Sequence, residues 1–259
     1  MLKPKMEKTK VNVKSKIPKN VKLKTYLITI LLISVIFAGA LSYTIGQPYI
    51  GDVSEVWVQP PFSEASYVVG EYNSTHYYAR NSSTGEYEWL STNASYVINN
   101  ALGGLTSGRT WKETVLLKGN FTINSPIRMV SYAHLLIQGN ITLADDSNCN
   151  MIENYDRIVG NTEMVIEGLG HAMLEGNKYE QTAGNGVDIC NAVDMPGTVF
   201  RMENLDVLHC KVDGVVVQLS SVDNYYIRNV RSILHSRCGF VLHASDSWLV
   251  DSCGSGYGE

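Results

Sequence analysis

Short apolar runs separated by turn residues recur along most of the chain. "VLLKGNFTI" begins at Val115, and "LLIQGNITL" begins twenty residues later at Leu135. In both segments apolar and polar positions alternate on either side of a Gly-Asn step, which is typical of two short strands joined by a turn. The alternation predicts that Val115, Leu117, Phe121, Ile123 and their counterparts in the second segment face a common core.

A longer repeat lies further along the chain. "FRMENLDVLHCKVDGVVVQL" and "YYIRNVRSILHSRCGFVLHA" match at a shift of 25 residues. Apolar residues then fall on apolar residues, and two acidic residues fall on two arginines. The matched pairs include Phe200 on Tyr225, Met202 on Ile227, Glu203 on Arg228, Asn204 on Asn229, Leu205 on Val230, Asp206 on Arg231, Val215 on Phe240 and Val217 on Leu242. Opposite charges on adjacent strands contribute roughly 0.2–1 kcal/mol per pair.

Other segments fit the same pattern. "GVDI" at Gly186 matches the strand openings at Gly214 and Gly239, and "VIEG" at Val165 echoes "LIQG" at Leu136. Repeats made only of strand and turn are typical of a solenoid, in which each coil buries its apolar side against its neighbours. We therefore predict an all-β solenoid of about six coils at the strand spacing of ~4.8 Å.

The segment before the repeats predicts two further elements. "SYVVGEYNSTHYYARNSSTGEYEWL" alternates around turn clusters and predicts a hairpin or meander. "STNASYVINNALGGL" predicts a short amphipathic helix, capped by Thr92 or Asn93 and ended by Gly103 and Gly104. Such a helix is expected to cover the open end of the first coil.

Charge is divided unevenly along the chain. Nine lysines lie between Lys3 and Lys24, and twenty uncharged residues follow from Tyr26 to Ile45. That length spans a membrane as a helix, and the lysines keep the N-terminus cytoplasmic. The predicted organisation is a basic cytoplasmic tail (1–24), a transmembrane signal anchor (25–46), a stalk (47–65), a hairpin with capping helix (66–110) and a β-helix (111–259). The alternative is a signal peptide cleaved after Ala40, which would make the protein secreted.

Export makes Asn-x-Ser/Thr triplets relevant as glycosylation sites. Five of them occur, at Asn73, Asn81, Asn93, Asn120 and Asn140. The alternative is that these residues only form turns. The five cysteines show no paired metal-binding spacing. Export permits disulfides without demanding them, and one cysteine must stay unpaired within the chain. A small buried core residue is the first role that we expect.

The repeats and the capping segment resemble the pectate lyase-like superfamily of right-handed parallel β-helices. The resemblance rests on "ASYVINNALGGL", "ETVLLKGNFTINSPIRMVSYAHLLIQGNITL" and "MVIEGLGHAMLEGN", and it covers about residues 66–259. It implies a right-handed parallel β-helix, which here has an N-terminal hairpin and capping helix and follows the predicted transmembrane helix. Members of the superfamily include polysaccharide lyases, glycoside hydrolases, epimerases and adhesive proteins, so the fold alone does not select a function.

The residues that the resemblance implies for catalysis are incomplete. Asn161-Thr162-Glu163 precedes its strand, Asp145-Asp146 falls in a turn, and neither His-Gly nor Arg-x-Lys occurs. "WLVDSC" is similar to the lyase run that supplies a calcium-binding aspartate, so Asp251 is the one candidate metal ligand. Its alternative role is a stacked turn with Asn204 and Asn229.

A lyase also needs a base that removes the proton beside a uronate carboxylate. Arg228 and Arg231 already face carboxylates in the 25-residue register, whereas Arg201 and Arg237 do not. We therefore name Arg201 and Arg237 as candidate catalytic residues. A solvated surface role is their alternative.

Candidate ligand-binding residues fall in two groups. Asp188, Gln218 and His243 lie along outward positions of one set of strands, and Tyr226 and Trp248 offer rings that can stack on sugars. His209 and His235 occupy different rows and pair with no carboxylate at ligand spacing, so they are predicted not to bind metal.

Two functional hypotheses remain open. The first is a membrane-anchored cell-surface protein that binds carbohydrate or contributes to the cell envelope. The second is a polysaccharide lyase or glycoside hydrolase acting on acidic polysaccharide, with calcium as cofactor if it is a lyase. Nucleic acid is not an expected partner, because the only basic cluster is the leader. The chain stops within a coil at "SCGSGYGE", which indicates a fragment or an oligomer that covers the open end.

Overall fold

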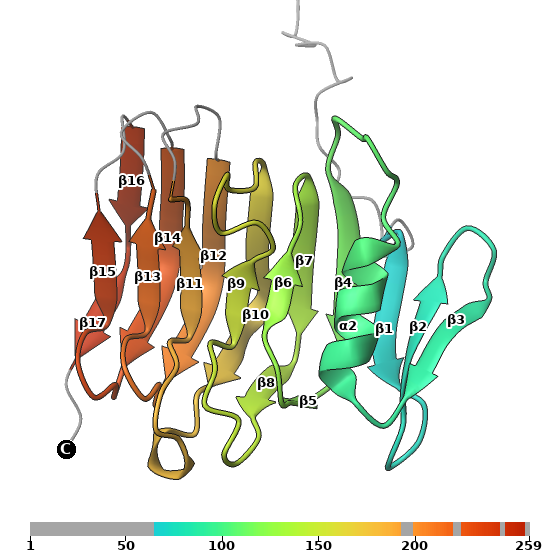
Figure 1. Cartoon of the computed structure of the whole chain (residues 1–259), viewed down its shortest axis with the longest axis horizontal. Coiled ribbons are helices and arrows are strands. Elements are labelled where there is room, and N and C mark those ends of the chain that lie inside the picture. Colours follow the sequence, from blue (N-terminus) through green and yellow to red (C-terminus); the bar gives the residue numbers. More distant parts are fainter. Residues whose placement is uncertain (1–64, 193–198, 220–223, 244–246, 257–259) are drawn as a thin grey trace, which may run out of the picture. The chain divides into compact units, whose positions relative to one another are not determined.

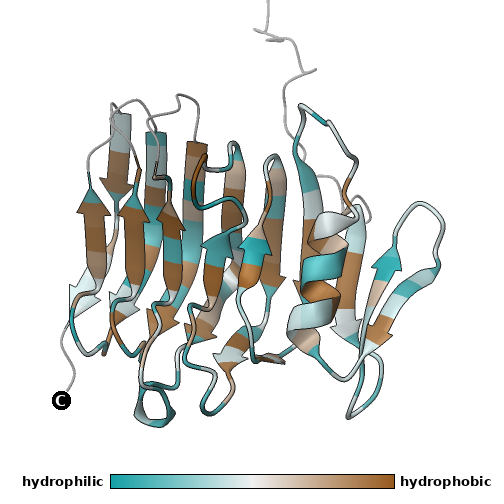
Figure 2. Cartoon of the chain, in the orientation of Figure 1, coloured by the Kyte–Doolittle hydropathy of each residue, from teal (hydrophilic) through white to brown (hydrophobic). Residues whose placement is uncertain are grey.

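Alternating apolar residues place every second side chain of the repeated strands in a common core. The computed structural model describes residues 65–192, 199–219, 224–243 and 247–256, which lie in the compact unit Gln59–Glu259. Two sheets of twelve and five strands line one apolar core, and their strands are stacked side by side (Figure 1). Along these strands, hydrophobic segments alternate with polar ones (Figure 2).

The larger sheet contains the N-terminal strands and the long strands. Its members are β1 (Tyr67–Glu71), β2 (Tyr77–Asn81), β3 (Tyr87–Ser91), β4 (Glu113–Lys118), β5 (Phe121–Ile123), β7 (Ala133–Gln138), β8 (Asn140–Leu143), β10 (Met164–Glu175), β12 (Val199–Leu208), β14 (Asn224–Ile233), β16 (Ser247–Asp251) and β17 (Gly254–Gly256). The smaller sheet contains β6 (Ile127–Met129), β9 (Ile152–Asn154), β11 (Val187–Cys190), β13 (Val215–Gln218) and β15 (Phe240–His243). Among the described residues, the helices are α2 (Ala94–Gly103) and a 3-10 turn (Lys178–Glu180).

From β4 onward the paired strands are parallel, and each pairs with strands of neighbouring coils. The order β4–β7–β10–β12–β14–β16 in one sheet is accompanied by β6–β9–β11–β13–β15 in the other. This arrangement is compatible with the predicted β-helix. The shift of 20 is confirmed, because Val115 pairs with Leu135 and Phe121 with Ile141. The shift of 25 is confirmed along β12–β14 and β13–β15.

The predicted meander and capping helix are both present. Strands β1, β2 and β3 are antiparallel, and β1 joins the parallel stack through β4. Asn93 caps α2, since its Oδ1 accepts a hydrogen bond of 3.1 Å from the Tyr96 amide. Val97, Ile98 and Leu102 are buried against the first coils. The helix therefore covers the core at this end, as the pattern predicted.

The long strands bend at one residue in the left-handed conformation. Asn204 and Asn229 occupy this bend with φ of 58° and 52°, and Asn229 Nδ2 donates a hydrogen bond of 2.8 Å to Asn204 Oδ1. Their predicted stacking is confirmed. The next member of the column is Ser252, with φ of 52°, and Asp251 instead pairs with Arg228 on the preceding strand position. A stacked-turn role for Asp251 is therefore wrong, because the bend falls one residue later.

The register predicted for "VIEG" is also wrong. Val165 pairs with His134, two residues before the Leu136 that the echo suggested. A shift by two residues leaves the same side chains facing inward, so the alternation of apolar residues cannot distinguish the two registers. Ile166 is buried in the observed register.

The first 64 residues lie outside the described part of the chain, and so do the predicted basic tail, anchor and nearly all of the stalk. In the ranges that are described, no helix has the length and hydrophobicity needed to cross a membrane. All five cysteines are described and are free thiols, and Cys210 is the one that is buried in the core.

Candidate functional site

Charged side chains form two rows on the outer face of the larger sheet. Their inward neighbours, such as Met202 and Ile227, are fully buried, so the alternation of the strand points these charges to solvent. We call this surface the ladder face. It comprises Glu167, Glu203, Arg228 and Asp251 before the bend and Asp206 and Arg231 after it.

Opposite charges stack along both rows. Arg228 Nη2 lies 3.7 Å from Glu203 Oε2, and Arg231 contacts both oxygens of Asp206 at 3.1 Å and 2.5 Å. Both arginine side chains are more than half exposed. Exposed pairs of this kind contribute little stability, about 0–1 kcal/mol. The guanidinium and carboxylate groups of these pairs therefore remain available to a ligand.

His134 lies diagonally beside the end of the first row, because it pairs with Val165, two residues before Glu167. Its Nε2 lies 3.1 Å from Glu167 Oε2, in an ion-pair contact without the alignment of a regular hydrogen bond. The contact with His134 lowers the pKa of Glu167, desolvation opposes this change, and the charge of Arg228 adds to it. Glu167 is therefore an ionised acceptor beside Glu203, its partner on the neighbouring strand.

The structure brings three of the sequence candidates to this face. Arg201 and Tyr226 are register partners, and the Arg201 guanidinium lies 5.2 Å from the centre of the Tyr226 ring. Arg201 has no ion pair with any described residue, as predicted. Asp251 lies beside Arg228 in the next strand. Catalysis by Arg201 would require it to leave the Tyr226 ring.

A surface pocket of about 520 Å³ adjoins the second row. It lies along the bend and is lined in part by His171, Asp206, Asn229, Arg231 and Ser252. His171 Nδ1 lies 3.7 Å from Asp206 Oδ1, and its Nε2 lies 3.2 Å from Asn229 Nδ2. Donors and acceptors thus alternate around the opening.

The second group of sequence candidates lies on the smaller sheet. Gln218 pairs with His243 in register, as predicted, and both are exposed. Asp188 is buried. Its carboxylate accepts hydrogen bonds of 2.9 Å from the Arg157 guanidinium and of 2.9 Å from Asn185 Nδ2. Burial lowers the pKa of Arg157, but the hydrogen bond and charge of Asp188 outweigh it and raise that pKa. Asp188 is thus committed to a structural ion pair.

Arg237 differs from its prediction. Its guanidinium binds both oxygens of Asp213, a carboxylate with no exposed surface, and this pairing raises the pKa of Arg237. Asp213 Oδ1 also accepts from the Cys238 amide at 3.1 Å. The expectation that Arg237 lacks a carboxylate partner is wrong, because the 25-residue match places Arg237 on Val212, whereas its side chain reaches diagonally to the next residue of the neighbouring turn, Asp213.

Trp248 occupies an inward position. It pairs with Tyr225, which pairs with the buried Phe200, so its ring belongs to the core row. The side chain is 63% exposed because β16 is the last strand in the described order of its sheet. Its exposure thus has a structural origin and does not mark a sugar platform on the ladder face.

Two histidines are held by specific partners. His209 Nδ1 lies 2.9 Å from Glu175 Oε2, so the expectation that it has no carboxylate partner is wrong. Glu175 ends β10 beside Leu208, which places it next to His209. His235 is buried, its Nδ1 accepts from the Cys210 amide, and its Nε2 lies 3.0 Å from Ser232 Oγ.

The hydrogen bonds of Ser232 determine the role of His235. Ser232 Oγ donates to the Gly239 carbonyl oxygen at 2.7 Å, so it accepts from His235 Nε2. A nucleophilic serine would need the opposite polarity, with the imidazole as acceptor. His235 is therefore a structural, neutral histidine.

His235 is expected to make stability depend on pH. Burial, followed by the charges of His209 and Lys178, lowers its pKa to about 4. In the unfolded chain the histidine pKa is about 6.5, so on acidification the unfolded state binds a proton before the folded state does. The stability that His235 contributes is therefore fully present above pH 6.5 and is lost as the pH falls to 4. The loss amounts to about 3 kcal/mol.

The measurement is urea unfolding at pH 7 and pH 4. His235→Asn keeps an acceptor for the Cys210 amide but does not titrate, so its stability should fall by about 3 kcal/mol less than that of the wild type over this interval. His243→Asn, on an exposed residue, is the control and should behave as the wild type. Equal losses in all three proteins would contradict the role given to His235.

The five glycosylation triplets lie at turns or strand ends. Asn73 and Asn81 each accept hydrogen bonds from the backbone and hydroxyl of the residue two positions on, Thr75 and Ser83. Asn93 is the helix cap. Asn120 and Asn140 belong to stacked turns, where Asn120 Oδ1 accepts from the Asn140 amide at 3.2 Å.

No group of three or more His, Cys, Asp or Glu side chains among the described residues is arranged to hold a metal ion. No protein-family model matches the chain, and comparisons with curated proteins and with solved structures find no match.

Proposed function

We propose that the protein is a right-handed parallel β-helix of the pectate lyase-like type, anchored in the membrane through residues 25–46, that binds a polysaccharide along the ladder face. The parallel coils, the capping helix and the asparagine bend support the fold. The observation that carries the function is the regular spacing of partly exposed carboxylates and guanidinium groups beside the Tyr226 ring.

The chemistry of these groups suits a sugar polymer. Carboxylates accept hydrogen bonds from neighbouring hydroxyls, guanidinium groups donate two parallel bonds to a carboxylate or hydroxyl pair, and a tyrosine ring packs on C–H surfaces. Parallel strands repeat these groups every ~4.8 Å along the stack. A repeating ligand can therefore meet a charged partner in each successive coil.

The test is binding of the detergent-solubilised full chain to a panel of neutral and uronate polysaccharides. We expect at least one to bind, and we expect Tyr226→Ala and Arg228→Gln each to weaken that binding about tenfold, the equivalent of ~1.4 kcal/mol. His243→Ala, on the smaller sheet, is the matched control and should bind as the wild type. Absence of binding across the panel, or equal binding by all variants, would refute the proposal.

One observation favours a glycoside hydrolase as a second candidate. Glu167 and Glu203 are direct partners on adjacent strands, at a backbone spacing of ~4.8 Å. Retaining glycosidases place two carboxyl groups about 5–5.5 Å apart. Release of new reducing ends by the wild type and its loss in Glu203→Gln would support hydrolysis, whereas binding without product would support the first proposal.

A further inference from the structure

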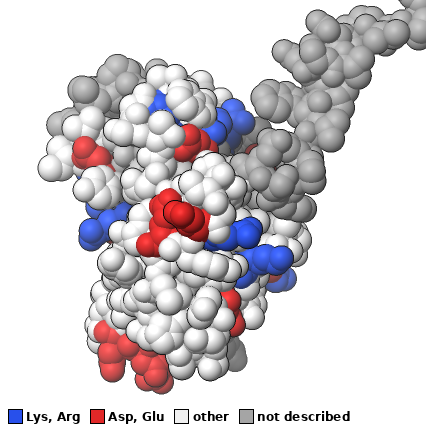
Figure 3. Space-filling view, turned by 90° about the vertical axis from the view of Figure 1, so that its right-hand side faces the viewer, with Lys and Arg blue, Asp and Glu red and all other residues white. Residues whose placement is uncertain are grey.

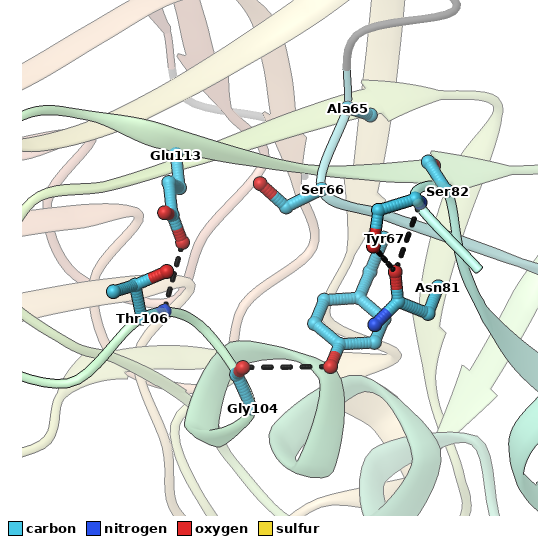
Figure 4. Close-up of a pocket in the computed structure, with 9 residues that line it drawn as sticks. Ala65, Ser66, Tyr67, Asn81, Ser82, Gly104, Thr106 and Glu113 are labelled. Atoms are coloured by element: carbon cyan, nitrogen blue, oxygen red, sulfur yellow. Dashed lines mark hydrogen bonds between the residues drawn. The ribbon is translucent and has the colours of Figure 1, made fainter.

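A second pocket lies far from the ladder face, between the β1–β3 meander and the segment that follows α2 (Figure 4). The end of the molecule that carries the meander is mostly uncharged on its surface (Figure 3). The pocket has a volume of about 460 Å³, within the range of small-molecule sites. Its polar lining includes Ser66, Tyr67, Asn81, Ser82, Thr106 and Glu113.

Glu88 holds two of the lining residues in place. Its Oε2 accepts from the Tyr67 hydroxyl at 2.8 Å, and its Oε1 accepts from Asn81 Nδ2 at 2.7 Å. Burial, together with Glu88, raises the pKa of Tyr67 to about 12, so the hydroxyl stays protonated. The Tyr67 ring also packs against Trp89 at 5.3 Å between centres. This wall of the pocket is therefore preorganised.

The opposite wall supplies an ionised acceptor. Glu113 Oε2 accepts from the Thr106 amide at 2.9 Å. Desolvation raises the pKa of Glu113, but the Thr106 hydrogen bonds and the charge of Arg109 outweigh it and lower that pKa. Across the opening, the hydroxyls of Ser66 and Ser82 make no hydrogen bond to another residue in the described ranges. They are free to donate and accept.

This lining selects for a particular ligand chemistry. No lysine or arginine lines the pocket among the described residues, and Glu113 repels anions, so phosphates and uronates are disfavoured. A carboxylate, two free hydroxyls, an amide and the edge of an aromatic ring together suit a ligand with several neighbouring hydroxyls. We propose that this pocket binds one neutral sugar unit.

The sugar has two chemical sources. It can be a free neutral saccharide, or it can be the first residue of a glycan attached at Asn81, whose side chain lies at the pocket beside Ser82. Ser83→Ala removes the acceptor triplet and the hydrogen bond of 2.7 Å from the Ser83 hydroxyl to Asn81 Oδ1, but the Ser83 backbone amide still donates to that oxygen at 2.9 Å. This inference does not depend on the proposed function, because the two sites share no residue.

The test uses the full chain from a host without N-glycosylation, titrated with neutral monosaccharides and followed by NMR. We expect binding that weakens at least tenfold in Glu113→Gln, which keeps the shape of the side chain, and in Ser66→Ala/Ser82→Ala. Arg228→Gln, on the ladder face, should bind these sugars as the wild type does. Thermal unfolding of each variant verifies that it is folded.

The same titration of chain from a glycosylating host identifies the source. If the glycosylated chain does not bind the sugars and Ser83→Ala restores binding, the attached glycan is the occupant. If the glycosylated chain binds as the unglycosylated chain does, the ligand is a free sugar. The proposal is overturned if the unglycosylated chain binds none of the sugars, or if Glu113→Gln and the double serine variant bind them as tightly as the wild type.

Discussion

Replacing Phe200 by alanine is expected to lower the free energy of unfolding by about 3–5 kcal/mol. Phe200 has no exposed surface and lies in β12, between Met164 of β10 and Tyr225 of β14. Removal of the ring loses its transfer free energy and leaves a cavity that coils fixed on both sides cannot close. Urea unfolding followed by circular dichroism measures the change.

Trp248 provides the matched control. It belongs to the same inward row two strands later, yet it is 63% exposed. Trp248→Ala should therefore cost less than about 1 kcal/mol, as substitutions at exposed positions do. Equal small losses would contradict the burial of Phe200, and equal large losses would contradict the exposure of Trp248.

Gly139→Ala is expected to destabilise the protein by roughly 3 kcal/mol or more. Gly139 has φ of 134°, and a Cβ at this position would lie 2.0 Å from the carbonyl oxygen of Gly119 in the stacked turn. Backbone strain and the clash act together, and neither turn can move without breaking the pairing of its coil.

Gly119→Ala separates the two causes. Gly119 also has a positive φ, of 122°, but the nearest atom to its Cβ would be a Glu71 oxygen at 3.7 Å. Only the conformational strain remains, so we expect a loss of about 1–3 kcal/mol. Thermal unfolding of both variants in parallel gives the comparison. A larger loss at Gly119 than at Gly139 would contradict the stacking of the two turns.

The face of each strand was predictable from the sequence because it depends only on a period of two. Val115 pairs with Leu135, and Glu203 pairs with Arg228, as the matched text predicts. The absolute register of β10 was not predictable in the same way. A shift of the pairing by two residues leaves the same side chains of β10 buried, so alternation does not fix the register. In addition, "GLGH" of β10 places extra residues opposite the single bend residue Asn204 of β12.

The candidate site was predictable only where it follows the repeat. The 25-residue match predicts the ladder-face pairs Glu203–Arg228 and Asp206–Arg231. Turn lengths vary between coils, so alternation along strands carries no information about which side chains meet across turns, as Arg237 and Asp213 do.

The sugar pocket of the meander could not be found from the sequence. Its lining comes from β1, the β2–β3 turn and the start of β4, which follow no common repeat. Hydroxyl residues are also frequent in ordinary turns, so Ser66 and Ser82 carry no signal of their own. Only their approach to Glu113 in space distinguishes them.

The left-handed bend residues Asn204, Asn229 and Ser252 give the coils of β12, β14 and β16 the same corner, whatever the length of their other turns. A gene duplication of one such 25-residue unit would insert a coil between β12 and β14 with its corner already aligned. The new coil would add one more acidic or basic step to the ladder face and leave the remaining steps intact. The length of the ladder face can therefore change in whole coils.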